Sequence, residues 1–271
     1  MRGNFDTQLP SSFLAWLNNK LDKEGEAFST QNVTLFKQTD PSRSTLNVYA
    51  SPYKGWVYDS CATSVISGVY TTSGQYLTRS SGIEFDFNNG RVLSSGNWGQ
   101  TLTGTISRKE YNVYFTTDEK ATLFLENGTD SNKNVKFTET GVTPYDFAAP
   151  CIFVTAATAQ NVPFAFGGID NSQRTFRLLV VSDNNYHQEA LKGLLVDSAR
   201  QNFPLIEDSA TPFTFYGDLK SGYYNYCDIR NTYGCASGAY IKEVNSFKIP
   251  VENNATSMLL SAFEVKLEKI R

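Results

Sequence analysis

Few side chains in this sequence carry the groups from which active sites are usually built. His187 is the only histidine among 271 residues, and the four cysteines are scattered at Cys61, Cys151, Cys227 and Cys235. General acid–base, nucleophilic and zinc chemistry all need several such groups in one place. The sequence therefore predicts a protein that is not an enzyme, with no catalytic residue, no cofactor and no metal site.

His187 follows Asp183, Asn184 and Asn185, which stand where a helix is expected to start. A histidine base needs a nucleophile and an orienting partner, and the positive end of a helix dipole disfavours its charged form. The neighbouring side chains lack the twelve-residue loop with a terminal glutamate that is typical of calcium sites. We therefore interpret His187 as an ordinary polar surface residue.

Two other sequence features bear on chemistry. Phe166-Gly167-Gly168 precedes an expected strand and not a helix, so it predicts a tight bend and no phosphate-binding loop. A pair of carboxylates suited to glycoside hydrolysis can come from distant strands and leaves no local pattern. Glycan cleavage is therefore the enzymatic alternative.

Aromatic residues are far more numerous than reactive ones, with 15 Tyr, 19 Phe and 3 Trp. The densest tyrosine cluster is interleaved with glycines and comprises Tyr216, Tyr223, Tyr224, Tyr226 and Tyr233. Such a stretch can build a protein interface, pack within the chain or stack on a ligand. Its only basic members are Lys220 and Arg230, which is too few to indicate a nucleic-acid groove. We favour an interface, with candidate residues Tyr223, Tyr224 and Tyr226.

The composition indicates a protein that hides surface in an assembly. Charged residues make up 19% of the chain, below the usual quarter or so, and interface cores are depleted in them. The net charge of −3 gives no general attraction to nucleic acid. No stretch approaches the roughly 20 apolar residues that span a bilayer. The first ten residues are polar and lack the apolar region of a signal peptide, so export is not expected.

The cysteines are expected to be reduced. Cys227 and Cys235 are close enough in sequence to bridge a loop, although a cytosol would keep them as thiols. Cys61 and Cys151 stand among apolar or small residues, and we interpret them as small core residues.

An amphipathic helix is expected at the N-terminus. Pro10 with Ser11 and Ser12 indicates its start and Gly25 its end. The apolar residues recur at spacings of three and four and fall on one face; they are Leu9, Phe13, Trp16, Leu17 and Leu21. The expected polar face carries Asn18, Asn19, Lys20, Asp22 and Lys23. This helix either packs on its own domain or docks as an arm on a neighbouring subunit, with candidate interface residues Phe13, Trp16 and Leu17.

The pattern after this helix is that of short strands. Alternating apolar residues separated by turn residues continue to about Phe153. The clearest hairpin joins residues 83–87 to residues 91–93 through Asn88-Asn89-Gly90, since Asn-Gly tolerates the positive φ of tight hairpin turns. Short strands at this spacing predict a sandwich or barrel.

The last third predicts a strand–helix–strand unit and closing strands. Residues 174–181 form a strong strand pattern, Asp183 or Asn184 is the expected helix cap, and the helix runs to about Arg200. Residues 240–249 are expected to pair with a long strand at the chain end, which is either paired inside the sheet or offered partly to a neighbour. The fold class is therefore α+β and mainly β. We expect a helix or arm at 1–27, a β-sandwich-like domain at 28–160 and an α+β domain at 161–271.

Several segments together resemble a virion structural protein of contractile-tailed marine cyanophages. They are LPSSFLAWL at 9–17, GIEFDFNNGRV at 82–92, PFAFGGID at 163–170 with the strand at 174–183 and its helix, GYYNY at 222–226, and LEKIR at 267–271. In this order they span nearly the whole chain.

This resemblance implies a minor virion component without enzymatic residues, similar to the ring-forming neck or tail-completion proteins at the head–tail junction. The implied partners are further copies of the chain in a homo-oligomeric ring and other neck or tail proteins, with no membrane and with DNA contacted only as a channel lining. The implied location is the virion, and the host cytoplasm during assembly. The alternative is a baseplate, fibre or head-decoration module that binds, or cleaves, host glycans. Ring subunits meet through two different patches, for which the N-terminal helix, the tyrosine cluster and the C-terminal strand are the candidates.

Overall fold

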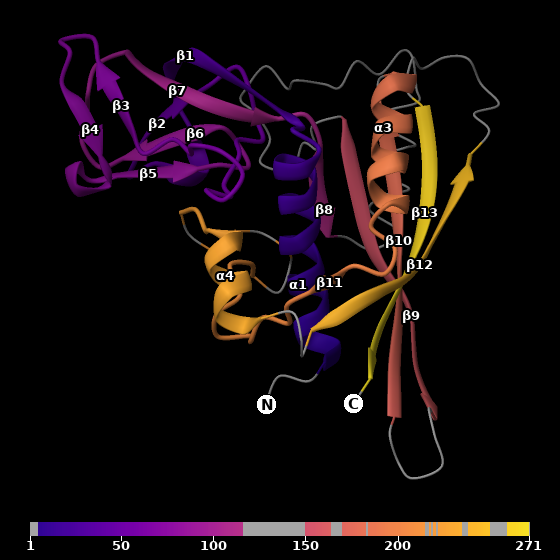
Figure 1. The fold of residues 1–271 in the computed structure, drawn as a ribbon. Helices are drawn as coiled ribbons and strands as arrows, with labels where there is room; N and C mark the ends of the chain where they lie inside the picture. The colour runs from indigo at the N-terminus through magenta and orange to yellow at the C-terminus, as the bar shows by residue number, and fades with distance from the viewer. Residues whose placement is uncertain are drawn as a thin grey trace.

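Two β-sheets enclose the N-terminal helix between them (Figure 1). The computed structural model describes residues 5–115, 150–163, 170–182, 184–214, 217, 219–220, 222–234, 238–249 and 259–270. Asp183, the bend at 166–168, Tyr216 and Cys235 lie outside these residues. The fold is α+β and mainly β, as predicted, with a curled first sheet and a strand–helix–strand unit in the second.

The helix α1 spans Phe5–Asn19 and continues as a π-helical turn at Lys20–Glu24, ending at Gly25 as predicted. Its predicted start at Pro10 is wrong, because Pro10 lies inside the helix. Ser12 does not cap the helix. Its hydroxyl donates to the Gln8 carbonyl one turn back (2.7 Å) and accepts from the Ile206 backbone N–H (2.8 Å). The serine therefore ties the helix to a distant segment, where the sequence pattern indicated a helix start.

The first sheet is antiparallel and has the order β4-β3-β7-β1-β2-β6-β5. Its strands are β1 (Phe28–Gln38), β2 (Asn47–Ala50), β3 (Gly68–Thr71), β4 (Tyr76–Thr78), β5 (Ile83–Asp86), β6 (Arg91–Ser94) and β7 (Thr101–Lys109). Two short 3-10 turns interrupt it, at Pro41–Arg43 and Arg79–Ser81. The predicted hairpin is confirmed as β5–β6. Gly90 has a φ of +65°, and a Cβ there would stand 2.1 Å from the Tyr53 carbonyl oxygen, so only glycine fits.

The second sheet has the order β11-β12-β13-β10-β9-β8, and only the β8–β9 pair is parallel. Its strands are β8 (Asn112–Phe115), β9 (Cys151–Pro163), β10 (Asp170–Ser182), β11 (Asn202–Phe203), β12 (Ala239–Lys248) and β13 (Leu259–Ile270). The expected pairing of the last two strands is confirmed. Because β13 lies between β12 and β10, both of its edges are occupied within the chain, and it does not offer an edge to a neighbour.

Two shorter helices pack beside these sheets. The helix α3 (Asn185–Val196) follows β10, and its predicted cap is confirmed, since Asn184 Oδ1 accepts from the His187 backbone N–H at 2.8 Å. It lies along the second sheet, while α4 (Tyr226–Tyr233) lies beside α1 on the side of the first sheet (Figure 1). The expected boundary between residues 160 and 161 falls inside β9. The two sheets instead divide between Lys109 and Asn112, because β8 and β9 pair with each other and not with the first sheet.

One hydrophobic core joins both sheets to α1. Phe13 stacks on Phe176 of β10 with ring centroids 5.0 Å apart, and Trp16 lies 5.8 Å from Phe203 of β11. The helix therefore packs within its own chain, which was one of the two expected arrangements.

Candidate functional site

The structure places five of the six candidate interface residues in the core. Phe13 and Leu17 are fully buried, and Trp16, Tyr224 and Tyr226 are 6%, 9% and 5% exposed. These side chains are covered by the chain's own strands and loops, so they offer no surface to a neighbour. The prediction that these five residues form an interface is therefore wrong. An aromatic stripe that packs inside the chain has the same sequence pattern as one that docks on a partner, so the sequence could not distinguish the two.

Tyr223 is the exception, at 48% exposed, with the Arg79 guanidinium 5.9 Å from its ring centroid. The difference from Tyr224 has a local cause. Tyr224 exchanges backbone hydrogen bonds with Tyr58 and Ser60 in an extended stretch, and neighbouring residues of an extended chain point to opposite sides. Tyr223 therefore points to solvent while Tyr224 points into the core.

A buried polar cluster lies where α1 meets the first sheet. It consists of Asn18, Asp22, Tyr58 and Lys109, which are 2%, 1%, 6% and 2% exposed. Lys109 Nζ donates to Asn18 Oδ1, lies 3.6 Å from Asp22 Oδ2 and stands 3.5 Å from the centroid of the Tyr58 ring. The Tyr58 hydroxyl donates to the same Asn18 oxygen at 3.0 Å. The expected polar face of the helix is thus partly buried, and the sequence pattern gave no sign of this cluster.

Burial sets the electrostatics of the cluster. It raises the pKa of Asp22 from 3.8 to about 6, an effect that the Lys109 charge only partly offsets. Burial alone lowers the pKa of Lys109, but Asp22, Tyr58 and Asp59 together raise it above its ordinary value. The pKa of Tyr58 is also raised, chiefly by burial. The ion pair of Asp22 and Lys109 is therefore held in a buried space.

Asp59 extends the cluster towards α4. One of its oxygens accepts from the backbone N–H groups of Cys61 and Tyr226, both at 3.0 Å, and the other accepts from Asn19 Nδ2 at 2.7 Å. This single buried carboxylate fixes α1, the loop after Tyr58 and the start of α4 relative to one another.

A disulfide bond joins the same two segments. Cys61 and Cys227 are bonded, with their Cα atoms 5.5 Å apart and a sequence separation of 166. The expectation that Cys61 is a free core residue and that Cys227 is a thiol close to Cys235 is therefore wrong. Nothing in the sequence spacing indicates this pair, because the fold alone brings them together. Cys151 is a buried free cysteine as predicted, and burial raises the pKa of its thiol to about 12.

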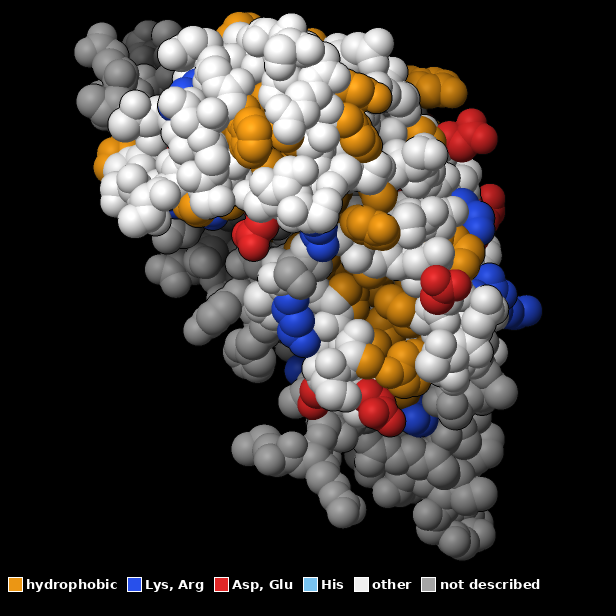
Figure 2. Space-filling model, turned by 90° about the vertical axis from the view of Figure 1, so that its left-hand side faces the viewer, with side chains coloured by type: hydrophobic (Ala, Val, Ile, Leu, Met, Phe, Trp, Pro, Cys, Tyr) orange, Lys and Arg blue, Asp and Glu red, His pale blue; other side chains and the backbone are white. Residues whose placement is uncertain are grey.

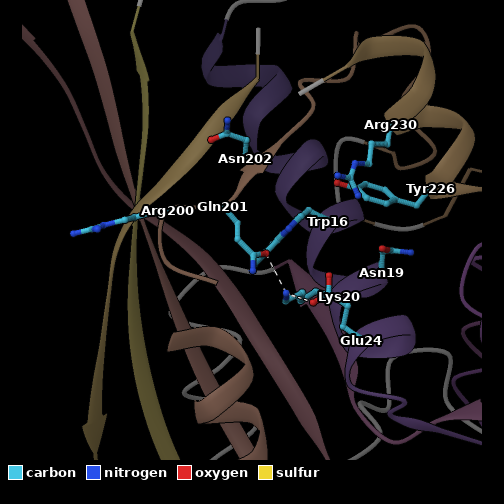
Figure 3. Close-up of a pocket in the computed structure, with 9 residues that line it drawn as sticks. All are labelled: Trp16, Asn19, Lys20, Glu24, Arg200, Gln201, Asn202, Tyr226 and Arg230. Atoms are coloured by element: carbon cyan, nitrogen blue, oxygen red, sulfur yellow. Dashed lines mark hydrogen bonds and ion pairs between the residues drawn. The ribbon is translucent and has the colours of Figure 1, made fainter. Parts of the chain in front are cut away.

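A polar pocket of about 490 Å³ opens beside the cluster (Figure 3). It is lined by Trp16, Asn19, Lys20, Glu24, Arg200, Gln201, Asn202, Tyr226 and Arg230. Lys20 is paired with Glu24 and donates to Gln201 Oε1 at 3.0 Å. Figure 3 shows Arg200 pointing away from the other lining side chains. The basic groups do not converge on one point, so the pocket does not define an anion site.

A second feature is an uncharged surface on the first sheet, the aromatic–threonine face, formed by Thr34, Phe36, Tyr70, Tyr76 and Thr103. Cross-strand pairing sets Tyr76, Tyr70, Thr103 and Thr34 in one row across β4, β3, β7 and β1, and Phe36 follows Thr34 on the same face of β1. Phe36, Tyr70 and Tyr76 are 53%, 49% and 46% exposed, and the two tyrosine rings lie 4.7 Å apart. Figure 2 shows the side formed by this sheet as mostly uncharged, with separate groups of hydrophobic side chains.

His187 lies in the first turn of α3, with 29% of its side chain exposed. Its ring contacts Tyr111 edge-on, and Nε2 is 3.9 Å from Glu110 Oε2. Among the described residues, no three His, Cys, Asp or Glu side chains gather as a metal site requires.

No helix in the described part of the chain has both the length and the apolar character needed to cross a membrane.

No protein-family model matches this chain, and no curated protein matches it in sequence.

Proposed function

We propose that this chain is a non-enzymatic virion structural protein of a contractile-tailed phage, which forms a ring in the neck or completes the tail. The cyanophage resemblance supports this assignment, as does the low charged fraction of 19%. The observation that carries it is the aromatic–threonine face, because three large rings on β4, β3 and β1 stand about half exposed on one sheet. Interface cores are enriched in aromatic residues and depleted in charged ones.

A closed ring needs a second, different patch on each subunit. Tyr186 at the start of α3 and Phe247 near the end of β12 are 80% and 50% exposed. The elements that carry them lie on the opposite side of the molecule from the first sheet (Figure 1). In the proposed ring, the aromatic–threonine face of one subunit contacts this second side of the next.

The proposed location is the virion, after assembly in the host cytoplasm. Partners are further copies of the chain and neighbouring neck or tail proteins, with DNA contacted only where the ring lines a channel. The Cys61–Cys227 disulfide is compatible with this route, because a particle released from its host leaves the reducing cytoplasm.

The decisive test is a cryo-electron-microscopy reconstruction of the particle with this chain traced into density. A closed ring at the head–tail junction, with Tyr70 and Tyr76 in the subunit contact, is the expected result. The double variant Tyr70→Ser/Tyr76→Ser should then block incorporation of the protein into particles. Tyr223→Ser is the matched control, because Tyr223 is equally exposed but lies outside both patches. A position at a fibre tip or on the capsid exterior would contradict the proposal.

The same face supports one alternative, a baseplate, fibre or head-decoration module that binds host glycans. Aromatic rings stack on the apolar faces of sugars, and threonine hydroxyls are neutral hydrogen-bonding partners for sugar hydroxyls. Titration of the protein with host surface polysaccharide separates the two functions. Binding that Tyr70→Ser/Tyr76→Ser abolishes would favour the glycan module, and particles that still assemble with this variant would exclude the ring.

A further inference from the structure

The polar cluster beneath α1 brings a lysine amine against the side-chain amide of an asparagine. Lys109 Nζ is hydrogen-bonded to Asn18 Oδ1, the oxygen attached to the amide carbon Cγ. Both residues are 2% exposed, so water does not solvate these groups and packing restricts the rotation of their side chains. An amine held next to an acyl carbon in a fixed orientation has a high effective concentration for attack on that carbon.

Two further groups complete this arrangement. Asp22 Oδ2 lies 3.6 Å from the amine nitrogen, and this buried oxygen has no hydrogen-bond partner among the residues that the structure describes. The Tyr58 hydroxyl donates to Asn18 Oδ1 at 3.0 Å, which is where negative charge would develop during attack on Cγ. The site therefore contains a nucleophile, an electrophile, a carboxylate able to move protons and an oxyanion donor.

We propose that Lys109 and Asn18 join in an intramolecular isopeptide bond between Nζ and Cγ, with release of ammonia, and that Asp22 is the catalytic residue. The bond would connect α1 to β7 across 91 residues of sequence.

The reaction balances with the groups present. Asp22 takes a proton from the ammonium of Lys109, and the neutral Nζ attacks Asn18 Cγ with its electron pair, while the C–O double bond opens to an oxyanion that Tyr58 stabilises. The carboxyl of Asp22 then gives its proton to Asn18 Nδ2 and removes one from the new N–C linkage. The carbonyl re-forms, the Cγ–Nδ2 bond breaks, and ammonia leaves. No oxidant, reductant or external nucleophile takes part. The second proton that Asp22 takes from Nζ leaves with the ammonia as ammonium, so Asp22 ends as a carboxylate.

Burial of the pair lowers the cost of moving the proton from Lys109 to Asp22. Transfer of the proton from Lys109 to Asp22 removes two charges from a buried space, where charge is costly. The pKa of Asp22 is raised to about 6, which makes this carboxylate a better proton acceptor than an ordinary aspartate. Asp22, Tyr58 and Asp59 hold the pKa of Lys109 above its ordinary value, so the proton rests on Lys109 before the reaction. The contribution of Asp22 ends once Asp22 has accepted the proton.

A neighbouring lysine provides a comparison within the molecule. Lys20 also donates to a side-chain amide, Gln201, and pairs with a carboxylate, Glu24. Glu24 is 55% exposed and this group opens into the pocket of Figure 3. Lys20 is itself buried, but its carboxylate partner is in contact with solvent, whereas the carboxylate beside Lys109 is buried.

The test is the intact mass of the purified, chemically reduced chain, followed by tryptic peptide mapping. The expected mass is lower than the sequence mass by one ammonia. The peptide spanning residues 3–20 should be joined to the peptide spanning residues 109–120. Lys109→Arg and Asp22→Asn should each restore the full mass, whereas the matched control Lys20→Arg should keep the loss.

The wild-type chain alone decides the outcome, even if a variant fails to fold. The full sequence mass, with Asn18 and Lys109 recovered in separate peptides, overturns the proposal. An ammonia loss that maps to a cyclised asparagine without a partner peptide overturns it as well. The result does not depend on where the protein acts, so it stands or falls separately from the ring assignment.

Discussion

The two ends of the N-terminal helical segment make opposite kinds of contact. Towards the second sheet, Phe13 stacks on Phe176 and packs near Phe203, an apolar contact without direction. Towards the first sheet, the buried polar cluster of Asn18, Asp22, Tyr58 and Lys109 makes contacts in which each atom has a set partner. The helical segment thus contacts the second sheet through buried apolar surface and the first sheet through directional polar interactions. The comparison teaches that the first contact supplies stability, whereas the second fixes position and brings reactive groups together.

The apolar contact should be the more costly to remove. Phe13→Ala is expected to lower the free energy of unfolding by about 4 kcal/mol, because it deletes a fully buried ring and leaves a cavity. Chemical denaturation measures this change. Phe36→Ala is the control, since Phe36 is 53% exposed and its removal should alter stability by less than about 0.5 kcal/mol. Equal losses in the two variants would contradict the assignment of Phe13 to the core.

Removing one partner of the polar contact should destabilise the fold for a different reason. Relative to the chain in which Lys109 and Asn18 are not joined, Lys109→Met is expected to cost about 3 to 4 kcal/mol, because Asp22 is left buried without its partner. Adding Asp22→Leu should recover most of this loss, since a buried ion pair can often be replaced by apolar residues of similar volume. Thermal or urea unfolding of the single and double variants gives the comparison. A double variant no more stable than Lys109→Met would show that the charge of Asp22 is not what destabilises the single variant.

The pH dependence of stability distinguishes the two contacts directly. The pKa of Asp22 is about 6 in the folded chain and 3.8 as a reference value, so the folded state binds more protons between about pH 4 and pH 6. The free energy of unfolding therefore falls as pH rises through this window, by on the order of 3 kcal/mol. Asp22→Asn should remove this slope. An isopeptide bond leaves its sign unchanged, because the Lys109 charge lowers the pKa of Asp22 and its loss raises it.

The smallest stability effect is expected on the exposed face of the first sheet. Tyr70→Ser/Tyr76→Ser removes a cross-strand aromatic pair that is half solvated, so unfolding should change by less than about 1 kcal/mol. Urea denaturation of this variant measures the difference. A loss comparable to that of Phe13→Ala would mean that these rings serve the core, and their use as an interface would lose its support.

The sequence predicted the helices and strands better than the contacts between them. Periodicity located α1, the β5–β6 hairpin and the pairing of β12 with β13, because each depends on spacing within one or two segments. It placed Asn18 and Asp22 on a solvated face, since polar residues on a helix have the same pattern whether they meet water or a buried lysine. Lys109 ends an ordinary strand, and Cys61 and Cys227 share no local pattern. Contacts between residues this far apart depend on how the two sheets close around the helix.

The disulfide between Cys61 and Cys227 also has a mechanical consequence. It spans 166 residues, including all of β3 to β11. Tension applied at the two ends of the chain passes directly from one cysteine to the other, so the strands inside this loop bear none of it. Among the described elements, only those outside the loop can be drawn out, namely α1, β1, β2, α4 after Cys227, β12 and β13. In a chain without the Lys109–Asn18 bond, reduction of the disulfide would lengthen the fully stretched chain by roughly 550 Å.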